Sequence, residues 1–417
     1  MRISLLVILT LLYSVLITGC NEAVVDSDPS ADGIVRALDD TEKALSEAGN
    51  EFSYQIFHEL TREGEDENIF ISPLSISIAF AMLLNGAEGE TFDEIRQTLE
   101  LRGHDLQAIN ENYHSLIRYL REVDQSVEFA IANSVWHDER FSVSDTFLTR
   151  LDKYYNASAE GLDFRDRASV GRINDWVSKS TNGLIDSILD EIPEEMVLYL
   201  INALYFKGEW LYQFDEKNTA EGDFFTEGGN RTRVELMRAE SSYATYFSEE
   251  VQMIEVPYGD SLFTMTIIMP ADMDQPLDPF ISEKLTAENL DYWTENLWSG
   301  NIQLKMPKFS MEYEKTLNEV MQSLGVERVF QEGVAELGGL SANGLNNLFV
   351  SEVKHKTFLE VNEEGSEAAA VTSIGVQLTS VTPSVPKFTV NRPFAFLIRE
   401  RASGSILFMG KMKNPSL

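Results

Sequence analysis

Apolar side chains return at helical spacing in several stretches of the chain. Phe52, Ile56, Phe57 and Leu60 recur three or four residues apart, which is the period of one face of an α-helix. Three further groups share this spacing: Ile76, Ala79, Phe80 and Leu83; Phe92, Ile95 and Leu99; and Ile173, Trp176 and Val177. We predict amphipathic helices at these four places, with the apolar faces turned toward a core.

Runs of β-branched and aromatic residues predict strands. These runs are Val127–Trp136, Val197–Phe206, Tyr243–Phe247, Phe263–Met269, Ile302–Met306, Phe358–Val361, Lys387–Val390, Phe394–Arg399 and Ile406–Met409. Because helices crowd the first half and strands the second, we predict an α+β fold with more than one sheet. No linker-like stretch and no internal repeat is visible after Glu51, so we predict a single domain over residues 49–417.

One segment has the alternation of a strand but lies where a connection is expected. Residues 363–385 stand between two strong strand predictions and are long and almost uncharged for a connection. Every second residue from Ser366 is small or apolar, and the series ends in Ile374, Val376 and Leu378. A period of two with one buriable face is typical of a strand. The pattern alone leaves two interpretations open: an edge strand with a turn at Thr382-Pro383, or a loop that can enter a sheet.

The charge balance excludes several classes of partner and site. The 417 residues include 33 Lys and Arg against 68 Asp and Glu, a formal net charge of −35. Such a chain is not expected to bind nucleic acid through phosphate neutralisation. The single cysteine excludes an intramolecular disulfide, and five scattered histidines offer little for a metal site. We therefore expect neither a metal nor a cofactor.

The N-terminus has the features of a processing signal. Arg2 precedes the uncharged run Ile3–Thr18, which is short for a membrane span and typical of a secretory signal peptide. Leu16-Ile17-Thr18-Gly19-Cys20 resembles the bacterial lipobox, in which a diacylglycerol is attached to the cysteine; the alternative is a plain signal peptide with an accidental cysteine. We predict a lipoprotein signal peptide over 1–19, lipidation of Cys20 and an acidic tether over 20–48. The protein would be secreted and anchored to the cell envelope, on its extracellular face or in the periplasm.

A search for catalytic motifs gives no positive result. Gly339-Leu340-Ser341-Ala342-Asn343 lacks the last glycine of a nucleophile elbow. His58-Glu59 could open a zinc protease helix, but Arg62 occupies the place of the second histidine. Neither phosphate-loop nor dinucleotide-binding glycine patterns occur. We therefore expect that the protein is not an enzyme.

Several blocks in one order resemble the serpins, the serine protease inhibitors that act through a reactive loop. The most specific block is residues 355–370, HKTFLEVNEEGSEAAA, which resembles the family's hinge signature. The other blocks are residues 68–75 (NIFISPLS), 202–210 (NALYFKGEW), 391–394 (NRPF) and 408–411 (FMGK). The resemblance covers the chain from about Glu51 to Pro415. It implies three β-sheets (A, B and C), eight or nine helices and an exposed reactive-centre loop over about 363–386.

The resemblance also implies roles for individual residues. The hinge would comprise Glu363, Gly365, Ser366, Glu367, Ala368, Ala369 and Ala370. Ser72, Ser75, Asn202 and His355 would form the polar cluster where the strands of sheet A part, and Trp210 would stand where the loop first enters. An exposed strand histidine is the alternative for His355. The family's scissile bond lies fourteen residues after the hinge glycine, which gives Thr379–Ser380 by one count and Leu378–Thr379 by another.

The function that the resemblance implies is suicide inhibition. A serine protease would attack the loop, form a covalent acyl complex and be carried away as the loop enters sheet A. Small residues at the inward positions Ser366, Ala368 and Ala370 favour an inhibitor over the alternative, a non-inhibitory serpin acting as a binding or scaffold lipoprotein. Thr379 after Leu378 suits elastase-like or subtilisin-like proteases, with cross-inhibition of cysteine proteases open. We expect a monomer without a heparin site, held at the membrane through the lipid on Cys20.

Overall fold

The computed structural model describes residues 38–64, 67–345, 347–366 and 385–416. Within these ranges the chain forms nine α-helices. They are α1 (Asp40–Glu63), α2 (Pro73–Leu84), α3 (Gly89–Thr98), α4 (Leu106–Glu122), α5 (Asp145–Tyr155), α6 (Ala168–Ser180), α7 (Leu277–Lys284), α8 (Ala287–Glu295) and α9 (Asn318–Ser323). The four predicted helices are confirmed as α1, α2, α3 and α6. None of the helices in the described ranges is long and apolar enough to cross a bilayer.

The start of α1 corrects the predicted tether. The side chain of Asp39 accepts hydrogen bonds from the Thr41 and Glu42 backbone N–H groups, and Glu42 reciprocates in a capping box. Leu45 is buried and Ser46 hydrogen-bonds to Ser405 at 2.8 Å. The boundary at residue 48 is therefore wrong, because an acidic sequence with few apolar residues still carries a helix cap and a buried face.

The strands fall into three hydrogen-bonded groups. Their bounds are β1 (Ile69–Ile71), β2 (Val127–Asp138), β3 (Ser158–Leu162), β4 (Leu198–Glu209), β5 (Ala220–Phe225), β6 (Arg231–Phe247), β7 (Val251–Tyr258), β8 (Phe263–Pro270), β9 (Trp298–Pro307), β10 (Phe309–Thr316), β11 (Lys354–Val361), β12 (Gly365–Ser366), β13 (Lys387–Thr389), β14 (Phe394–Glu400) and β15 (Ile406–Met412). All nine predicted runs are confirmed as strands, and the predicted α+β class with more than one sheet is correct.

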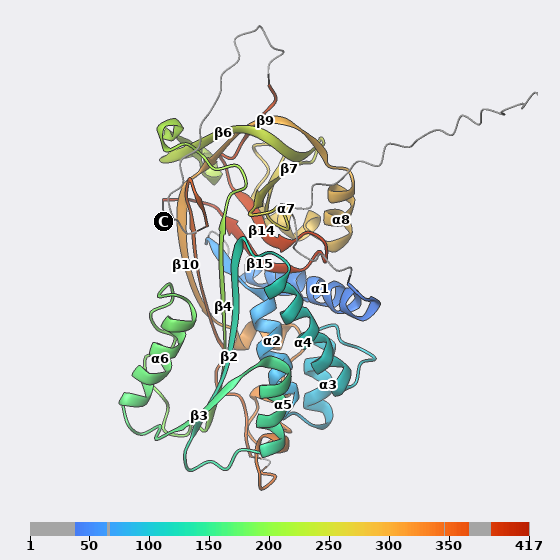
Figure 1. Cartoon of the computed structure of the whole chain (residues 1–417), viewed down its shortest axis with the longest axis vertical. Helices are drawn as coiled ribbons and strands as arrows, with labels where there is room; N and C mark the ends of the chain where they lie inside the picture. Colours follow the sequence, from blue (N-terminus) through green and yellow to red (C-terminus); the bar gives the residue numbers. More distant parts are fainter. Residues whose placement is uncertain (1–37, 65–66, 346, 367–384, 417) are drawn as a thin grey trace, which may run out of the picture. The chain divides into compact units, whose positions relative to one another are not determined.

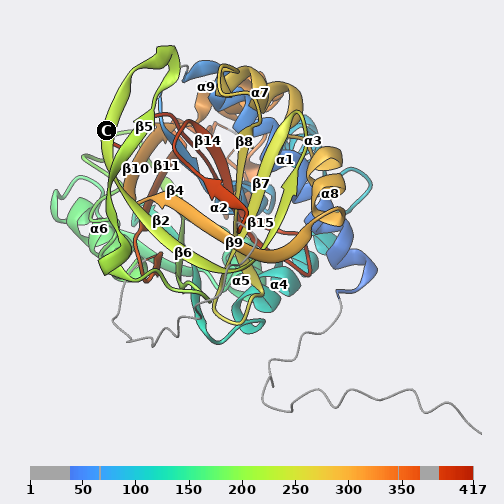
Figure 2. The same ribbon diagram turned by 90° about the horizontal axis from the view of Figure 1, so that it is seen from above.

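The largest group joins two sheets through one long strand. Its order is β1-β15-β14-β8-β7-β6-β9-β13, with β5 also paired to β6. β6 pairs with β7 through Ala244–Phe247 and with β9 through Leu236–Thr245. Figure 1 shows β6 and β9 at the upper end of the long strands β4 and β10, and Figure 2 shows β9 from above. The strand that follows the reactive-loop segment, β13, is thereby placed at this end.

The other two groups are a four-stranded sheet and an antiparallel pair. The four strands have the order β12-β4-β2-β3, and the pair is β10 with β11. Asn133 of β2 stands opposite Asn202 of β4. No strand pairing joins β4 to β11 within the described ranges. Between these two strands the sheet is therefore interrupted.

Two apolar clusters hold the helices to the sheets. The main core includes eight of the twelve residues of α2, and all but one residue of this helix is buried. A separate cluster holds α6 against β2 and β4 through Trp136, Ile173, Val177, Tyr199 and Ile201. The contact between α6 and the sheet is thus separate from the main core.

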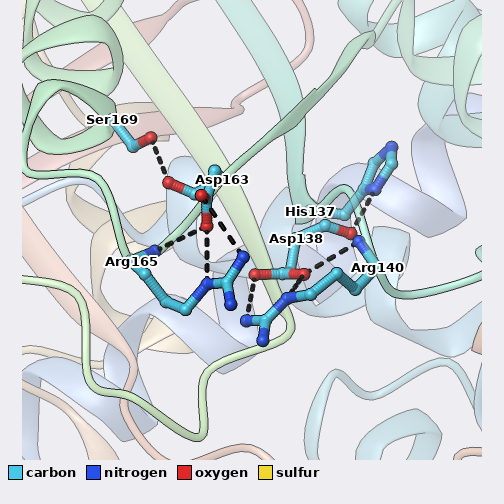
Figure 3. Close-up of polar contacts among 6 residues, drawn as sticks. All are labelled: His137, Asp138, Arg140, Asp163, Arg165 and Ser169. Carbon is cyan, nitrogen blue, oxygen red and sulfur yellow. Dashed lines mark hydrogen bonds and ion pairs between the residues drawn. The ribbon is translucent and has the colours of Figure 1, made fainter.

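Two aspartate–arginine pairs lie near each other, one at the end of β2 and one in the segment before α6 (Figure 3). Asp138 accepts two hydrogen bonds of 2.7 Å from the Arg140 guanidinium, and this contact is the main cause that lowers the pKa of Asp138 to about 2. Asp163 accepts from Arg165 at 2.9 Å, and its backbone oxygen accepts from the Ser169 hydroxyl. The contacts of Asp163 order the turn before α6, and those of Asp138 order the turn after β2.

Candidate functional site

A gap separates β4 from β11 where a further strand could lie. It contains a cavity of about 380 Å³, lined on one side by residues 195–203 and on the other by residues 347–356. Side chains of α2, of α6 and of the segment after α6 also line the cavity. A second space of about 20 Å³ continues between residues 204–206 and 357–359. Voids of this size are unusual in a packed domain. The space between β4 and β11 is therefore not ordinary imperfect packing.

The upper end of the gap is already occupied by the hinge. Gly365 and Ser366 form β12, paired with Glu209 and Gly208 of β4. A Cβ added to Gly365 would lie 2.1 Å from the Gly208 carbonyl oxygen. Only glycine fits there without moving the backbone of β4, which gives the hinge glycine a steric reason.

Aromatic stacking holds the hinge in place from one side. Trp210 donates from its indole N–H to the Asn362 carbonyl oxygen at 2.9 Å, and its backbone N–H donates to Glu364 O at 2.8 Å. Its ring stacks on Tyr258 with centroids 4.3 Å apart. The Tyr258 hydroxyl lies 2.7 Å from Ser366 Oγ. The side chain of Ser366 therefore points inward, as the sequence pattern predicts.

An ion pair fixes the hinge from the other side. Lys308 Nζ lies 2.9 Å from one oxygen of Glu363, and the Thr219 hydroxyl donates to the other at 2.8 Å. Burial alone would raise the pKa of Glu363, but the hydrogen bonds from Lys308 and Thr219 outweigh it, so the pKa is lowered. Glu363 is therefore held as a carboxylate that ties β12 to the start of β10.

The middle of the gap is crossed by a chain of polar groups. Ser72 caps α2, and its hydroxyl donates to Leu407 O at 2.8 Å. The Ser75 hydroxyl donates to Asn202 Oδ1, and Asn202 Nδ2 donates to Asn133 Oδ1 at 2.6 Å. The structure thus brings the predicted residues Ser72, Ser75 and Asn202 together.

His355 completes this cluster from β11. Its Nε2 accepts a 3.0 Å hydrogen bond from the Ser72 backbone N–H. The side chain is buried, so the alternative of an exposed strand histidine is wrong. Burial lowers the pKa of His355 to about 4, and an acceptor nitrogen also requires the neutral ring.

We expect the native protein to lose stability as the pH falls from about 6.5 to about 4. In this range the unfolded state takes up a proton on His355 that the folded state refuses, so the free energy of unfolding falls with pH. The full effect corresponds to about 3 kcal/mol. It is measured as the difference in urea midpoint between pH 7 and pH 4.5, compared with the His355→Gln variant. His114→Gln, on an exposed face of α4, serves as the control. An unchanged pH dependence in His355→Gln would contradict the assignment.

Some predicted positions lie outside the described residues. These are Cys20, the hinge residues Glu367, Ala368, Ala369 and Ala370, and the candidate bond residues Leu378, Thr379 and Ser380. Conversely, the sequence reasoning missed Lys308, Thr219 and Tyr258. Each contacts a hinge residue more than fifty positions away, and no local pattern marks such partners. No group of three His, Cys, Asp or Glu side chains that could hold a metal occurs in the described part of the chain.

Comparisons with known proteins decide the family. The sequence model described as "Serpin (serine protease inhibitor)" matches residues 47–415. The chain is a serpin. Human neuroserpin is 34% identical over 385 residues, covering 88% of this chain and 91% of that protein. Human leukocyte elastase inhibitor is 33% identical over 381 residues, covering 89% and 99%.

Solved structures agree with the serpin fold. Tengpin, a thermophilic serpin in the native state, superposes with a TM-score of 0.81 at 31% identity, covering 91% of this chain and 95% of that one. Human thyroxine-binding globulin gives a TM-score of 0.80 at 26% identity, covering 90% and 99%. The predicted serpin fold, with eight or nine helices and three sheets A, B and C, is thereby confirmed, and the described residues contain nine helices. In this serpin, sheet A comprises the β12-β4-β2-β3 group and the β10–β11 pair, and the gap interrupts it.

Proposed function

We propose that this serpin is a covalent inhibitor of serine proteases that works by inserting its cleaved loop between β4 and β11. The observation that carries the proposal is the match between the gap and the loop. β12 enters antiparallel to β4, with Ser366 opposite Gly208. Continued at one residue per step, this register sets residues 371–379 opposite residues 203–195. Residues 195–203 are those that line the cavity of about 380 Å³.

The same register supports the choice of inward positions. Directly opposed residues in an antiparallel pair share a face. Thr372 would therefore meet Asn202, whose side chain contacts Ser75 of α2 beneath the sheet. Ile374 and Val376 would stand beside Leu200 and Leu198, which line the cavity. The larger apolar side chains of the loop would thus occupy the cavity that is empty before insertion.

The proposed chemistry is that of an interrupted proteolysis. The protease serine attacks the Thr379 carbonyl carbon, the bond to the Ser380 nitrogen breaks, and the Ser380 amine leaves with a proton. Thr379 remains joined to the enzyme as an ester. About 14 inserted residues at ~3.3 Å each form a strand near 45 Å long, which carries the esterified enzyme to the far end of sheet A before water can hydrolyse the ester.

The proposed targets are proteases with shallow apolar specificity pockets. Thr379 follows Leu378 and carries no charge, which fits elastase-like or subtilisin-like enzymes and not those that require Arg or Lys. The relative named leukocyte elastase inhibitor lends support to this class. Cysteine proteases with similar pockets are a secondary class of target.

Incubation with pancreatic elastase and with subtilisin tests the proposal. We expect a complex that survives SDS, with a mass equal to the protease plus the serpin cut at the loop. Mass spectrometry of the released C-terminal peptide identifies the bond, with Ser380 as its first residue if Thr379–Ser380 is cut and Thr379 if the alternative is used. Active-site-blocked protease is the control. Cleavage without any trapped enzyme would contradict the inhibitor function.

A non-inhibitory binding role is the second candidate. It is favoured by the likeness to human thyroxine-binding globulin, whose structure was solved with its hormone. Under this role the protein would be a binding or scaffold lipoprotein, and the loop would be cleaved without trapping. The incubation just described separates the two.

We further propose that the protein is secreted and lipid-anchored to the cell envelope through Cys20. The sequence before Cys20 supports this. Expression in bacteria fed an alkyne fatty acid is expected to label the parent and leave the Cys20→Ala variant unlabelled. Label in Cys20→Ala, or none in the parent, would contradict the anchor.

A further inference from the structure

Three cations gather on the outer face of the sheet that carries the end of the reactive loop. Arg238 of β6 stands directly opposite Lys305 of β9. Lys387 of β13 pairs with Gln303, two residues along the same face of β9. Ile302 and Leu304, which alternate with Gln303 and Lys305 along β9, point into the core and are fully buried. The cationic cluster of Arg238, Lys305 and Lys387 therefore faces away from it.

No carboxylate forms an ion pair with this cluster within the described residues. None of the three side chains takes part in an ion pair there, although Asp and Glu outnumber Lys and Arg by two to one. One carboxylate lies beside the cluster: Glu240, opposite Gln303, accepts from Asn301 at 2.9 Å and offsets one of the three positive charges without forming an ion pair. The Arg238 Nε atom is buried without a hydrogen-bond acceptor.

The protein's own loop cannot supply the missing charge. Between Glu367 and Lys387 the sequence contains no Asp or Glu. Burial lowers the pKa of Lys305, and the neighbouring charges of Arg238 and Lys387 lower it further. Like charges opposed across a sheet destabilise it, so the three cations lower the stability of the free protein. An anion bound from outside would relieve this repulsion.

The position of the cluster indicates which outside molecule brings that anion. Lys387 follows Thr379 by eight residues, a reach of at most about 28 Å. A protease of roughly 250 residues has a radius of gyration near 18 Å. The surface of an enzyme bound at the scissile bond would therefore come close to β9 and β13. We propose that Arg238, Lys305 and Lys387 form an exosite for acidic side chains on the surface of the target protease. This inference rests on the proposed inhibitor function.

A protease of adjustable surface charge tests the exosite. The probe is subtilisin whose surface lysines have been succinylated, which replaces ammonium groups with carboxylates, beside the unmodified enzyme. The readout is the second-order rate constant for total loop attack, counting both trapped and cleaved serpin. The variant is Arg238→Gln/Lys305→Gln/Lys387→Gln. The matched control, Arg118→Gln/Arg121→Gln/Lys179→Gln, removes the same charge from α4 and α6, which Figure 1 shows well below β9.

We expect the exosite variant to react about tenfold more slowly than the parent with succinylated subtilisin at low ionic strength. The difference should shrink with the unmodified enzyme and vanish in 0.5 M salt, which is roughly where screening removes steering. The fraction of attacks that end in a trapped enzyme should not change. Equal rates for parent and variant, or an equal slowing by the control variant, would overturn the exosite. Loop attack without any trapped complex in the parent would instead overturn the inhibitor function, because the rate of attack is read in either case.

Discussion

The Ala370→Glu variant is expected to be cut by the protease and to trap almost none of it. The register of β12 on β4 sets residue 370 opposite Leu204, on the face that enters the smaller space between the strands. Phe70, Phe206 and Phe408 line that space. A carboxylate carried into it would lose its water and find no cation, at a cost of several kcal/mol. A rise of only about 1.4 kcal/mol in the insertion barrier slows insertion tenfold.

The measurement is the number of serpin molecules consumed per protease inhibited, which should rise at least about tenfold. Ala369→Glu is the matched control, since it adds the same charge one residue away on the outward face and should inhibit nearly as well as the parent. The melting temperature of uncut Ala370→Glu shows whether its native fold is intact. Inhibition by Ala370→Glu at the parent's stoichiometry would mean that residue 370 does not face inward.

Cutting the loop is expected to raise the melting temperature by more than about 10 °C. Insertion pairs the open edges of β4 and β11 and fills a cavity of about 380 Å³. A net gain of roughly 10 kcal/mol, spread over an unfolding entropy near 2.1 cal/mol/K per residue, corresponds to a shift of this size. Differential scanning calorimetry of intact and loop-cut protein measures it.

Two comparisons make this result specific. Ala370→Glu cut at the same bond should gain less, because its inserted strand carries the unpaired carboxylate. Protein nicked only in the segment before α1 should melt like the intact chain, since nothing is added to the sheet. Equal melting temperatures for intact and loop-cut parent would remove the driving force on which inhibition depends.

Periodicity in the sequence marked only some of the elements with an apolar face. α4, which buries Ile109, Tyr113, Leu116 and Leu120, and β7, which is buried along nearly its whole length, were not predicted. The stripes at α1, α2, α3 and α6 and the nine strand runs all correspond to elements, because burial imposes the spacing. α7 and α8 escaped notice since only a few of their residues are buried. β10 was missed for a related reason: only Phe309 and Met311 are buried along it, and charged residues alternate with them.

The candidate site was predictable only in part. The motifs located Ser72, Asn202, Trp210, His355, Glu363 and Gly365, since each lies in a recognisable block. Their partners Lys308, Thr219 and Tyr258 come from strands and turns that topology alone brings near. No sequence pattern predicts the gap. It exists because β4 and β11, which are far apart in the sequence, are not hydrogen-bonded to each other.

The short strand β12 favours insertion of the protein's own loop into sheet A over insertion of a strand from another molecule. Gly365 and Ser366 are already paired with Glu209 and Gly208. The loop residues that follow them in the sequence are therefore present at a high effective concentration, whereas a strand from another molecule must arrive by diffusion. Insertion of the protein's own loop is thus a first-order event, whose rate does not depend on the concentration of the protein.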